Sequence, residues 1–257
     1  MKYFLYRNQP LSYLEYGNPS GFPIIVQHGM IASIKDDSLF TDCLKKRARI
    51  ICVARPGYGQ SSPIFLDNYK EWGEIIYSLA KELSLEKFDI LSSSAGSPYG
   101  YAIGITCPDL VRNIYVYSGI PALYNENVQS KWPYPIIKDI SQQEAEKIAF
   151  DMFFANMPEE MAHIPYIEDS IKNNCFGVGQ ELRIRFEDWG FDLSDIKAKV
   201  YMQHCKQDEI VPFETAEITA RLLSDCHLNL VDEGSHFSVE SYQDFIEETV
   251  VPNIYES

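Results

Sequence analysis

Short apolar runs recur along the chain and alternate with stretches of helical periodicity. Each run is nearly continuous in apolar residues, which is typical of a strand buried on both faces of a sheet. Ahead of these runs, Leu11–Tyr16 alternates apolar and polar residues and predicts a half-buried strand. The predicted buried strands are Phe22–Gln27, Arg49–Ala54, Phe88–Leu91, Ile114–Tyr117, Val200–Gln203 and Leu228–Val231.

Between the strands, apolar residues follow the spacing of one helix face. Similar helical stretches lie at 216–223 and 245–250. Strands that alternate with helices predict the α/β class, with a mostly parallel central sheet and helices on both faces. Ligands of such folds gather at the carboxyl ends of the strands. The clearest helical stripe is formed by Trp72, Ile75, Ile76, Leu79 and Leu83.

The segment 120–190 interrupts this alternation. It has no buried-strand run, it contains a helix-like span at Gln142–Met157, and it is rich in large apolar side chains. We interpret 120–190 as an inserted, mostly helical cap, and 1–119 with 191–257 as the core that carries the sheet. Aromatic side chains of a cap are candidates for shaping a largely apolar substrate pocket, here Trp132, Phe153 and Phe154.

Composition and charge exclude several classes of protein. The 257 residues are 46% hydrophobic and 23% charged, as in globular chains and unlike disordered or fibrous ones. No apolar run approaches the roughly 18 residues of a membrane-spanning helix, and the N-terminal residues lack the pattern of a signal peptide. The net charge of −15 disfavours nucleic acid as a partner. We therefore expect a cytoplasmic protein that binds a small-molecule substrate, with no nucleic-acid or membrane partner. Its oligomeric state is left open.

The sequence contains no pattern of metal or cofactor binding. The five histidines lack HxH or HxxxH spacing, and the six cysteines lack CxxC spacing. The loop Arg55–Ser61 has two glycines but not the glycine-lysine ending of a phosphate loop. We expect no metal, no cofactor and reduced cysteines.

The strongest chemical signal is Leu91–Tyr99, which follows a predicted strand and precedes a helix-compatible stretch. A nucleophile on a tight strand-to-helix turn requires small neighbours, and Ser92, Ala95 and Gly96 surround Ser94. The start of the helix offers free backbone N–H groups where an oxyanion can form. Ser94 is therefore the candidate nucleophile.

A second loop, Gln27–Met30, follows another predicted strand. Gly29 allows the chain to turn there and to aim the backbone N–H of Met30 toward the same region. We predict an oxyanion hole formed by the N–H groups of Met30 and Ala95. We expect His28 to support this loop rather than to act as a base.

Two more candidate residues follow predicted strand ends. Asp208 comes shortly after Val200–Gln203, and His236 comes shortly after Leu228–Val231. Each alone is compatible with an ordinary loop residue. The order nucleophile, acid, histidine, each beyond a strand end, indicates a triad in which His236 accepts the proton of Ser94 and Asp208 orients the imidazole.

Five segments together resemble the α/β-hydrolase fold family, in the family's order along the chain. They are His28–Met30, Arg55–Ser61, Ser94–Tyr99, Asp208–Pro212 and Gly234–Phe237. The resemblance implies the α/β-hydrolase fold and the catalytic triad Ser94, Asp208 and His236. The chain departs from the family pattern at Ser92, where the elbow usually has glycine, at Ala54, where Asp is usual, and at Cys205, where Gly is frequent. None of these changes touches the triad.

A serine nucleophile on this fold points to acyl chemistry. We expect a hydrolase that cleaves an ester-type bond of a small, largely apolar substrate through an acyl-enzyme on Ser94. An aminopeptidase, an acyltransferase and a carbon–carbon bond hydrolase remain open as alternatives that use the same triad. A ligand receptor that binds without turnover is the alternative outside enzymology.

Overall fold

The computed structural model describes residues 1–254, and in this part of the chain eight strands form one sheet in the order β1-β2-β4-β3-β5-β6-β7-β8. The first two strands run antiparallel to their neighbours, and β3 to β8 are parallel. The predicted mostly parallel sheet is therefore confirmed. The strands are β1 Lys2–Tyr6, β2 Gln9–Gly17, β3 Phe22–Gln27, β4 Ala48–Val53, β5 Phe88–Ser93, β6 Val111–Tyr117, β7 Lys199–Cys205 and β8 Cys226–Val231.

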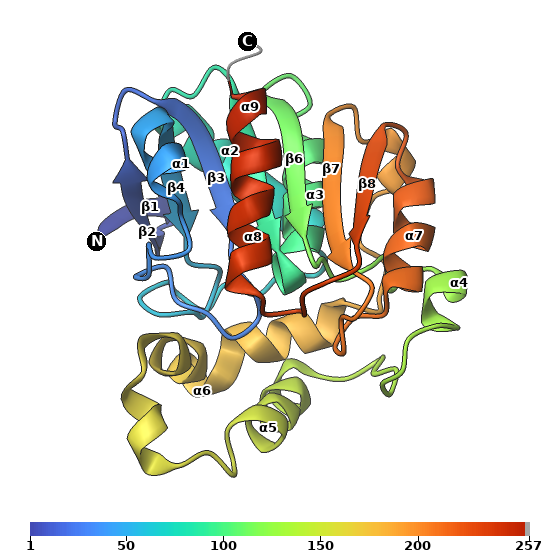
Figure 1. Cartoon of the computed structure of the whole chain (residues 1–257). Helices are drawn as coiled ribbons and strands as arrows, with labels where there is room; N and C mark the ends of the chain where they lie inside the picture. Colours follow the sequence, from blue (N-terminus) through green and yellow to red (C-terminus); the bar gives the residue numbers. More distant parts are fainter. Residues whose placement is uncertain (255–257) are drawn as a thin grey trace.

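Helices cover both faces of this sheet (Figure 1). Helices α2 and α3 lie behind the strands in that view, whereas α8 and α9 lie in front of them. A π-helical turn at Ile246–Val250 connects the last two. The helices are α1 Asp42–Arg47, α2 Lys70–Glu82, α3 Ser97–Thr106, α4 Glu126–Gln129, α5 Gln142–Phe153, α6 Pro165–Ile184, α7 Phe213–Leu222, α8 Val239–Phe245 and α9 Val251–Asn253.

The sheet separates two apolar cores, which explains why its central strands are apolar without interruption. Successive side chains of a strand point to opposite faces. Ile24 of β3 accordingly packs with Leu44 of α1 and Phe245 of α8, whereas its neighbour Ile25 packs with Trp72 of α2 on the other side. Both faces of β3 must be apolar, so no polar position alternates along it.

The segment between β6 and β7 carries α4, α5 and α6. Helices α5 and α6 lie together beyond the edge of the sheet at which the parallel strands end (Figure 1). The predicted helix-like span is observed as α5. Helix α6 is broken, because the backbone leaves helical geometry at Lys172 and takes positive φ at 173–175. The two ends of this segment pack elsewhere, since Trp132 and Trp189 belong to the core that α2 covers.

Helix α3 and the turn that leads into it present three glycines to the sheet, at positions 96, 100 and 104. A methyl group at Gly96 would lie 2.3 Å from the carbonyl oxygen of Gln27, and one at Gly104 would lie 2.6 Å from the terminal methyl group of Ile114. A backbone carbonyl cannot move without moving β3, whereas an isoleucine tip can rotate. The close approach at Gly96 is therefore the rigid one.

This difference gives a prediction about stability. Gly96→Ala is expected to lower the free energy of unfolding by about 1–3 kcal/mol, as overpacking against fixed atoms does. Gly104→Ala, inside α3 and also facing the sheet, is expected to cost clearly less, because helix propensity favours alanine there. Urea denaturation of both variants measures the difference, and equal losses would contradict this account.

Candidate active site

Ser94 occupies a strained turn between β5 and α3. Its φ is +47°, in the left-handed region that non-glycine residues rarely adopt. Ser93 before it is still extended, and residues 94–96 form one 3₁₀ turn that leads into the helix. Such strain is found at functional turns that a surrounding structure holds in place. The predicted elbow at Ser94 is present.

Three side chains from three different strand ends form one hydrogen-bonded chain. Ser94 Oγ lies 2.8 Å from His236 Nε2, and His236 Nδ1 lies 2.8 Å from Asp208 Oδ2. The side chains are nearly enclosed, with 5% of His236 and 8% of Asp208 exposed. Because Nδ1 donates a hydrogen bond to the carboxylate, Nε2 is left as the acceptor that faces the Ser94 hydroxyl. The structure thus brings together the three residues that the sequence singled out.

Asp208 is held as a carboxylate by several donors. Its Oδ1 accepts hydrogen bonds from the backbone N–H groups of Ile210 and Val211, at 2.9 Å and 2.8 Å. Burial alone would raise the pKa of Asp208, but the hydrogen bonds from His204, His236 and the Val211 backbone outweigh it and hold the pKa well below its usual range. Asp208 is therefore charged at neutral pH.

Sequence reasoning missed His204, which lies directly beside the acid. Its Nε2 is 3.3 Å from Asp208 Oδ2 and 2.8 Å from the carbonyl oxygen of Val211. The ring is fully buried at the end of β7. Its position directly after the predicted strand Val200–Gln203 gave no sign of this contact, because no local pattern shows how the following loop turns back.

The loop that follows β3 lies beside the nucleophile. A methyl group at Gly29 would lie 3.9 Å from the Cβ of Ser94, so the chain passes close to the elbow at this point. Ala95, which follows Ser94, is buried in the 3₁₀ turn. The backbone of both predicted oxyanion donors, Met30 and Ala95, therefore belongs to segments adjoining Ser94.

His28 supports this loop, as predicted. Its Nδ1 lies 2.7 Å from the carbonyl oxygen of Gly29, and its Nε2 accepts the backbone N–H of Arg55 at 3.3 Å. Burial and, second, the charge of Arg55 lower the pKa of His28 well below its ordinary value, so the ring is neutral. A neutral ring with one donor and one acceptor nitrogen satisfies both contacts.

A buried ion pair near this loop was also missed. Arg55 Nε lies 3.0 Å from Glu181 Oε1 of helix α6, and both residues are only 1% exposed. Burial raises the pKa of Glu181 to about 7, against the opposing effect of the Arg55 charge. In the sequence, Arg55 stands out only as part of the loop Arg55–Ser61, which contains two glycines. Glu181 shows no sign of a buried ion pair, because an acidic residue in a helical stretch is usually solvated.

The aromatic cap candidates lie in apolar packing. Trp132 packs edge-on against Tyr134 and Phe186, and Phe153 packs against the buried Phe154. Their role in a substrate pocket stays a prediction.

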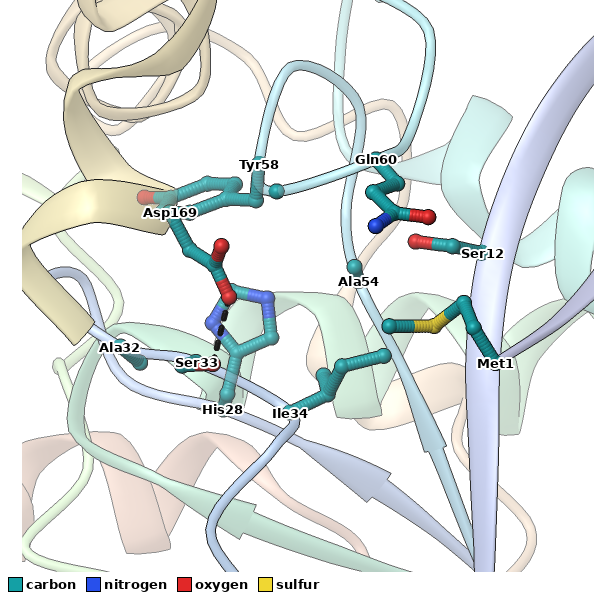
Figure 2. A pocket seen from close by; sticks show the side chains of 11 residues that line it. Met1, Ser12, His28, Ala32, Ser33, Ile34, Ala54, Tyr58, Gln60 and Asp169 are labelled. Carbon is teal, nitrogen blue, oxygen red and sulfur yellow. Dashed lines mark hydrogen bonds between the residues drawn. The ribbon is translucent and has the colours of Figure 1, made fainter. Parts of the chain in front are cut away.

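A small hollow lies between the loop that follows β3 and helix α6 (Figure 2). It is lined by His28, Ile34, Tyr58, Asp169 and others, and none of Ser94, Asp208 and His236 lines it. Asp169 accepts a hydrogen bond from Ser33 across it. The hollow is therefore separate from the hydrogen-bonded chain of Ser94, His236 and Asp208.

Metal-binding clusters and membrane-spanning helices are absent from the described residues. Within 1–254, no group of three His, Cys, Asp or Glu side chains is placed to hold a metal ion. Of the helices in this part of the chain, none has the length and apolar character needed to span a membrane.

The chain is distantly similar in sequence to known hydrolases. The chain matches no protein-family model. It is 22% identical over 237 residues to the 2-hydroxymuconate semialdehyde hydrolase of Pseudomonas sp., covering 85% of this chain and 82% of that protein. It is 27% identical over 108 residues to the uncharacterized hydrolase YcgS of Bacillus subtilis, and this match spans 42% of the chain and only 38% of that relative.

A solved structure shows the fold directly. The enol-lactonase of Burkholderia xenovorans superposes with a TM-score of 0.71 at 12% identity, over the whole of both chains. Other structures of α/β-hydrolase fold superpose over nearly the full length as well. The chain has the α/β-hydrolase fold, as predicted, and the predicted enzyme class, a hydrolase, is that of both curated relatives.

The low pKa of Asp208 predicts a pH-dependent contribution to stability. A carboxyl with a lowered pKa in the folded state stabilises the fold above its unfolded pKa of about 4, and this contribution is lost as the pH falls through the folded value. Asp208→Asn is therefore expected to lower the urea midpoint at pH 7, and the deficit is expected to shrink below about pH 4. Asp232→Asn, at an exposed ion pair with Lys206, is the matched control and is expected to show little deficit at either pH. A deficit for Asp208→Asn that does not change with pH would contradict the assignment.

Proposed function

We propose that the protein is a serine hydrolase that cleaves an ester-type bond of a small, largely apolar substrate. The observation that carries the proposal is the chain of two 2.8 Å contacts from Ser94 Oγ through His236 to the charged Asp208. A serine hydroxyl becomes a nucleophile when a base accepts its proton and a third group orients that base. The strained φ of Ser94 supports the same role.

The proposed cycle has two halves. His236 Nε2 takes the proton of Ser94 while Oγ attacks the substrate carbonyl, and the negative charge that forms on oxygen is bound by the N–H groups of Met30 and Ala95. The bond to the leaving group breaks, and that group receives the proton from His236. Water then transfers one proton to His236 while its oxygen attacks the acyl carbon. The bond from that carbon to Ser94 Oγ breaks, the carboxylic acid leaves, and His236 returns the proton to Oγ.

An ester-type substrate is supported by the fold neighbour that acts on an enol-lactone, since a lactone is a cyclic ester. The apolar character of the substrate is inferred from the cap, whose helices lie over the edge where the triad is assembled (Figure 1). Such a cover excludes water and strengthens electrostatic interactions within the site.

A second candidate is the hydrolysis of a carbon–carbon bond with the same residues. It is favoured by the relative that acts on 2-hydroxymuconate semialdehyde, a compound whose name includes no ester. The two candidates differ in the bond that breaks after the carbonyl is attacked. Turnover of a p-nitrophenyl ester, measured beside turnover of a semialdehyde of that kind, decides between them.

The nucleophile is tested by Ser94→Ala. This variant is expected to lose turnover of short p-nitrophenyl esters, because no oxygen remains to form the acyl-enzyme. Its thermal midpoint is expected to stay within a few degrees of the wild-type value, because the change removes one hydroxyl group and leaves the core packing intact. Ser93→Ala, one position earlier in the same turn, is the matched control. Undiminished activity of Ser94→Ala would overturn the assignment.

The acid is tested by Asp208→Asn. Loss of the orienting carboxylate is expected to lower kcat strongly, by up to about 10⁴-fold as in serine proteases. The rate is measured with the same ester at saturating concentration. A kcat near that of the wild type would mean that Asp208 does not orient His236.

A further inference from the structure

The carbonyl oxygen of Gly29 is a point at which two donors converge. His28 Nδ1 lies 2.7 Å from it, and Arg55 Nη2 lies 2.9 Å from it. A peptide unit is planar and trans, so its C=O and its N–H point in opposite directions. The N–H of Met30 belongs to the same peptide unit as the Gly29 carbonyl. Contacts that fix this carbonyl therefore fix the direction of the Met30 N–H.

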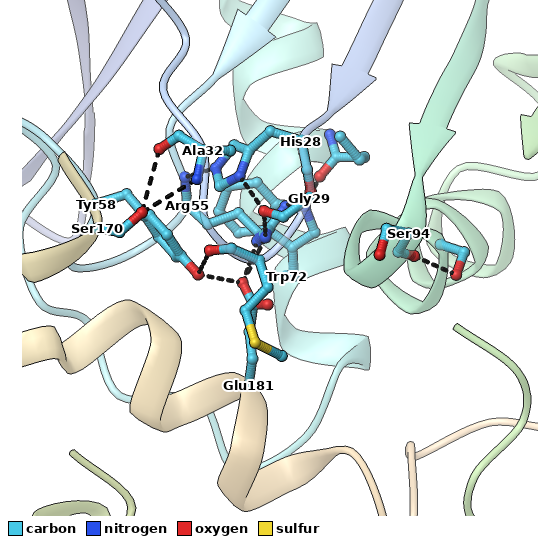
Figure 3. A network of polar contacts seen from close by, with 12 residues as sticks. His28, Gly29, Ala32, Arg55, Tyr58, Trp72, Ser94, Ser170 and Glu181 are labelled. Carbon is cyan, nitrogen blue, oxygen red and sulfur yellow. Dashed lines mark hydrogen bonds and ion pairs between the residues drawn. The ribbon is translucent and has the colours of Figure 1, made fainter. Parts of the chain in front are cut away.

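The loop after β4, which carries Arg55, also holds the carbonyl groups on either side of Gly29. Arg55 Nη1 donates a hydrogen bond to the carbonyl oxygen of His28, and the Tyr58 hydroxyl lies 2.6 Å from that of Met30. Three successive carbonyl groups, at positions 28, 29 and 30, thus have partners in two side chains. Figure 3 shows Arg55 lying between this loop and the cap helix.

The cap holds Arg55 in place. Glu181 Oε1 of α6 accepts from Arg55 Nε at 3.0 Å and also from Nη2, and the Tyr58 hydroxyl lies 2.8 Å from the same oxygen. The first half of α6 contacts the continuation of the loop, where Ser170 Oγ accepts the backbone N–H of Ala32 at 3.1 Å. The loop after β3 is therefore supported by both halves of one cap helix.

Stability alone gives a weak reason for this arrangement. Two charges that are 99% buried lose much of their hydration, and apolar side chains of similar volume are often at least as stabilising. What an apolar pair cannot supply is a set of donors in fixed directions. The guanidinium group provides that set, because its donors form a rigid planar fork.

We propose that Arg55 and Glu181 are positioning residues of the oxyanion hole. Glu181 holds the guanidinium group, the guanidinium group holds the Gly29 carbonyl, and the Met30 N–H is thereby aimed at the oxygen that becomes negative in the transition state. Helix α6 of the cap then supports the oxyanion hole in addition to covering the site. This inference rests on the proposed function.

The test uses Arg55→Lys and Glu181→Gln in the full chain. Lysine keeps the positive charge beside Glu181, but its three donors sit on one nitrogen and cannot take the separate positions of Nε, Nη1 and Nη2. Glutamine keeps the shape of Glu181 without its charge. Both acylation and deacylation pass through an oxyanion, so kcat is expected to fall about 10- to 100-fold, less than the roughly 10²–10³-fold loss on removal of a donor. KM is expected to stay within about twofold, because the donor acts in the transition state.

Two matched controls make the same chemical changes away from the loop. Arg112→Lys alters a partly buried arginine, 3.0 Å from the buried Asp89 between β5 and β6. Glu168→Gln removes a charge from α6 itself, at a half-exposed pair with Lys172. Rates are divided by the number of active sites that a fluorophosphonate titrates, so a variant that merely folds less well keeps its kcat per site. Both controls are expected to keep kcat within about twofold.

The outcomes separate the two claims. A loss of kcat per site in Arg55→Lys or Glu181→Gln, with KM and both controls unchanged, supports the positioning role. Wild-type kcat per site in Arg55→Lys overturns that role while the serine hydrolase stands, even if the melting temperature has fallen. If Glu181→Gln does not fold, Arg55→Lys alone decides. Absence of fluorophosphonate labelling in the wild type overturns the proposed function and, with it, the positioning role.

Discussion

The parallel direction of β3 to β8 is the constraint on which the rest of the structure depends. Because these strands point the same way, their carboxyl ends meet at one edge of the sheet. Four parts of the chain that are distant in sequence come together at this edge. They are the loop 28–30, Ser94, Asp208 and His236. The triad distances of 2.8 Å follow from where each strand stops. Each side chain needs only a short loop to reach the others, which keeps the site rigid.

Burial decides which charges this edge can hold. Asp208 stays ionised although it is enclosed, because two backbone N–H groups and two histidines donate to it or lie beside it. Arg55 of the loop after β4 and Glu181 of α6 pair with each other, although burial still raises the pKa of Glu181. Charges held in this way have fixed directions, and that property suits groups that orient a base or a backbone donor.

The fold, and the meeting of Ser94, His236 and Asp208, could be predicted because both leave local signals. Continuous apolar runs mark strands buried on both faces, and small residues around Ser94 mark a tight turn. The prediction ended β5 at Leu91, whereas the strand continues to Ser93, because buried serines do not count as apolar. The pair of Arg55 and Glu181 joins residues 126 positions apart and leaves no local pattern. The sequence also marks Trp132 and Phe154 as large apolar side chains of the segment 120–190, but it does not show which cavity or core they face.

The central claim is that Ser94 carries the acyl group, and trapping that intermediate tests it most directly. The protein is mixed with p-nitrophenyl acetate, quenched in acid within the first turnover, digested and analysed by tandem mass spectrometry. The account predicts one acetyl group per chain, on Ser94. Acetylation of another residue, such as Cys205 or a lysine, with Ser94 unmodified during active turnover, would contradict it.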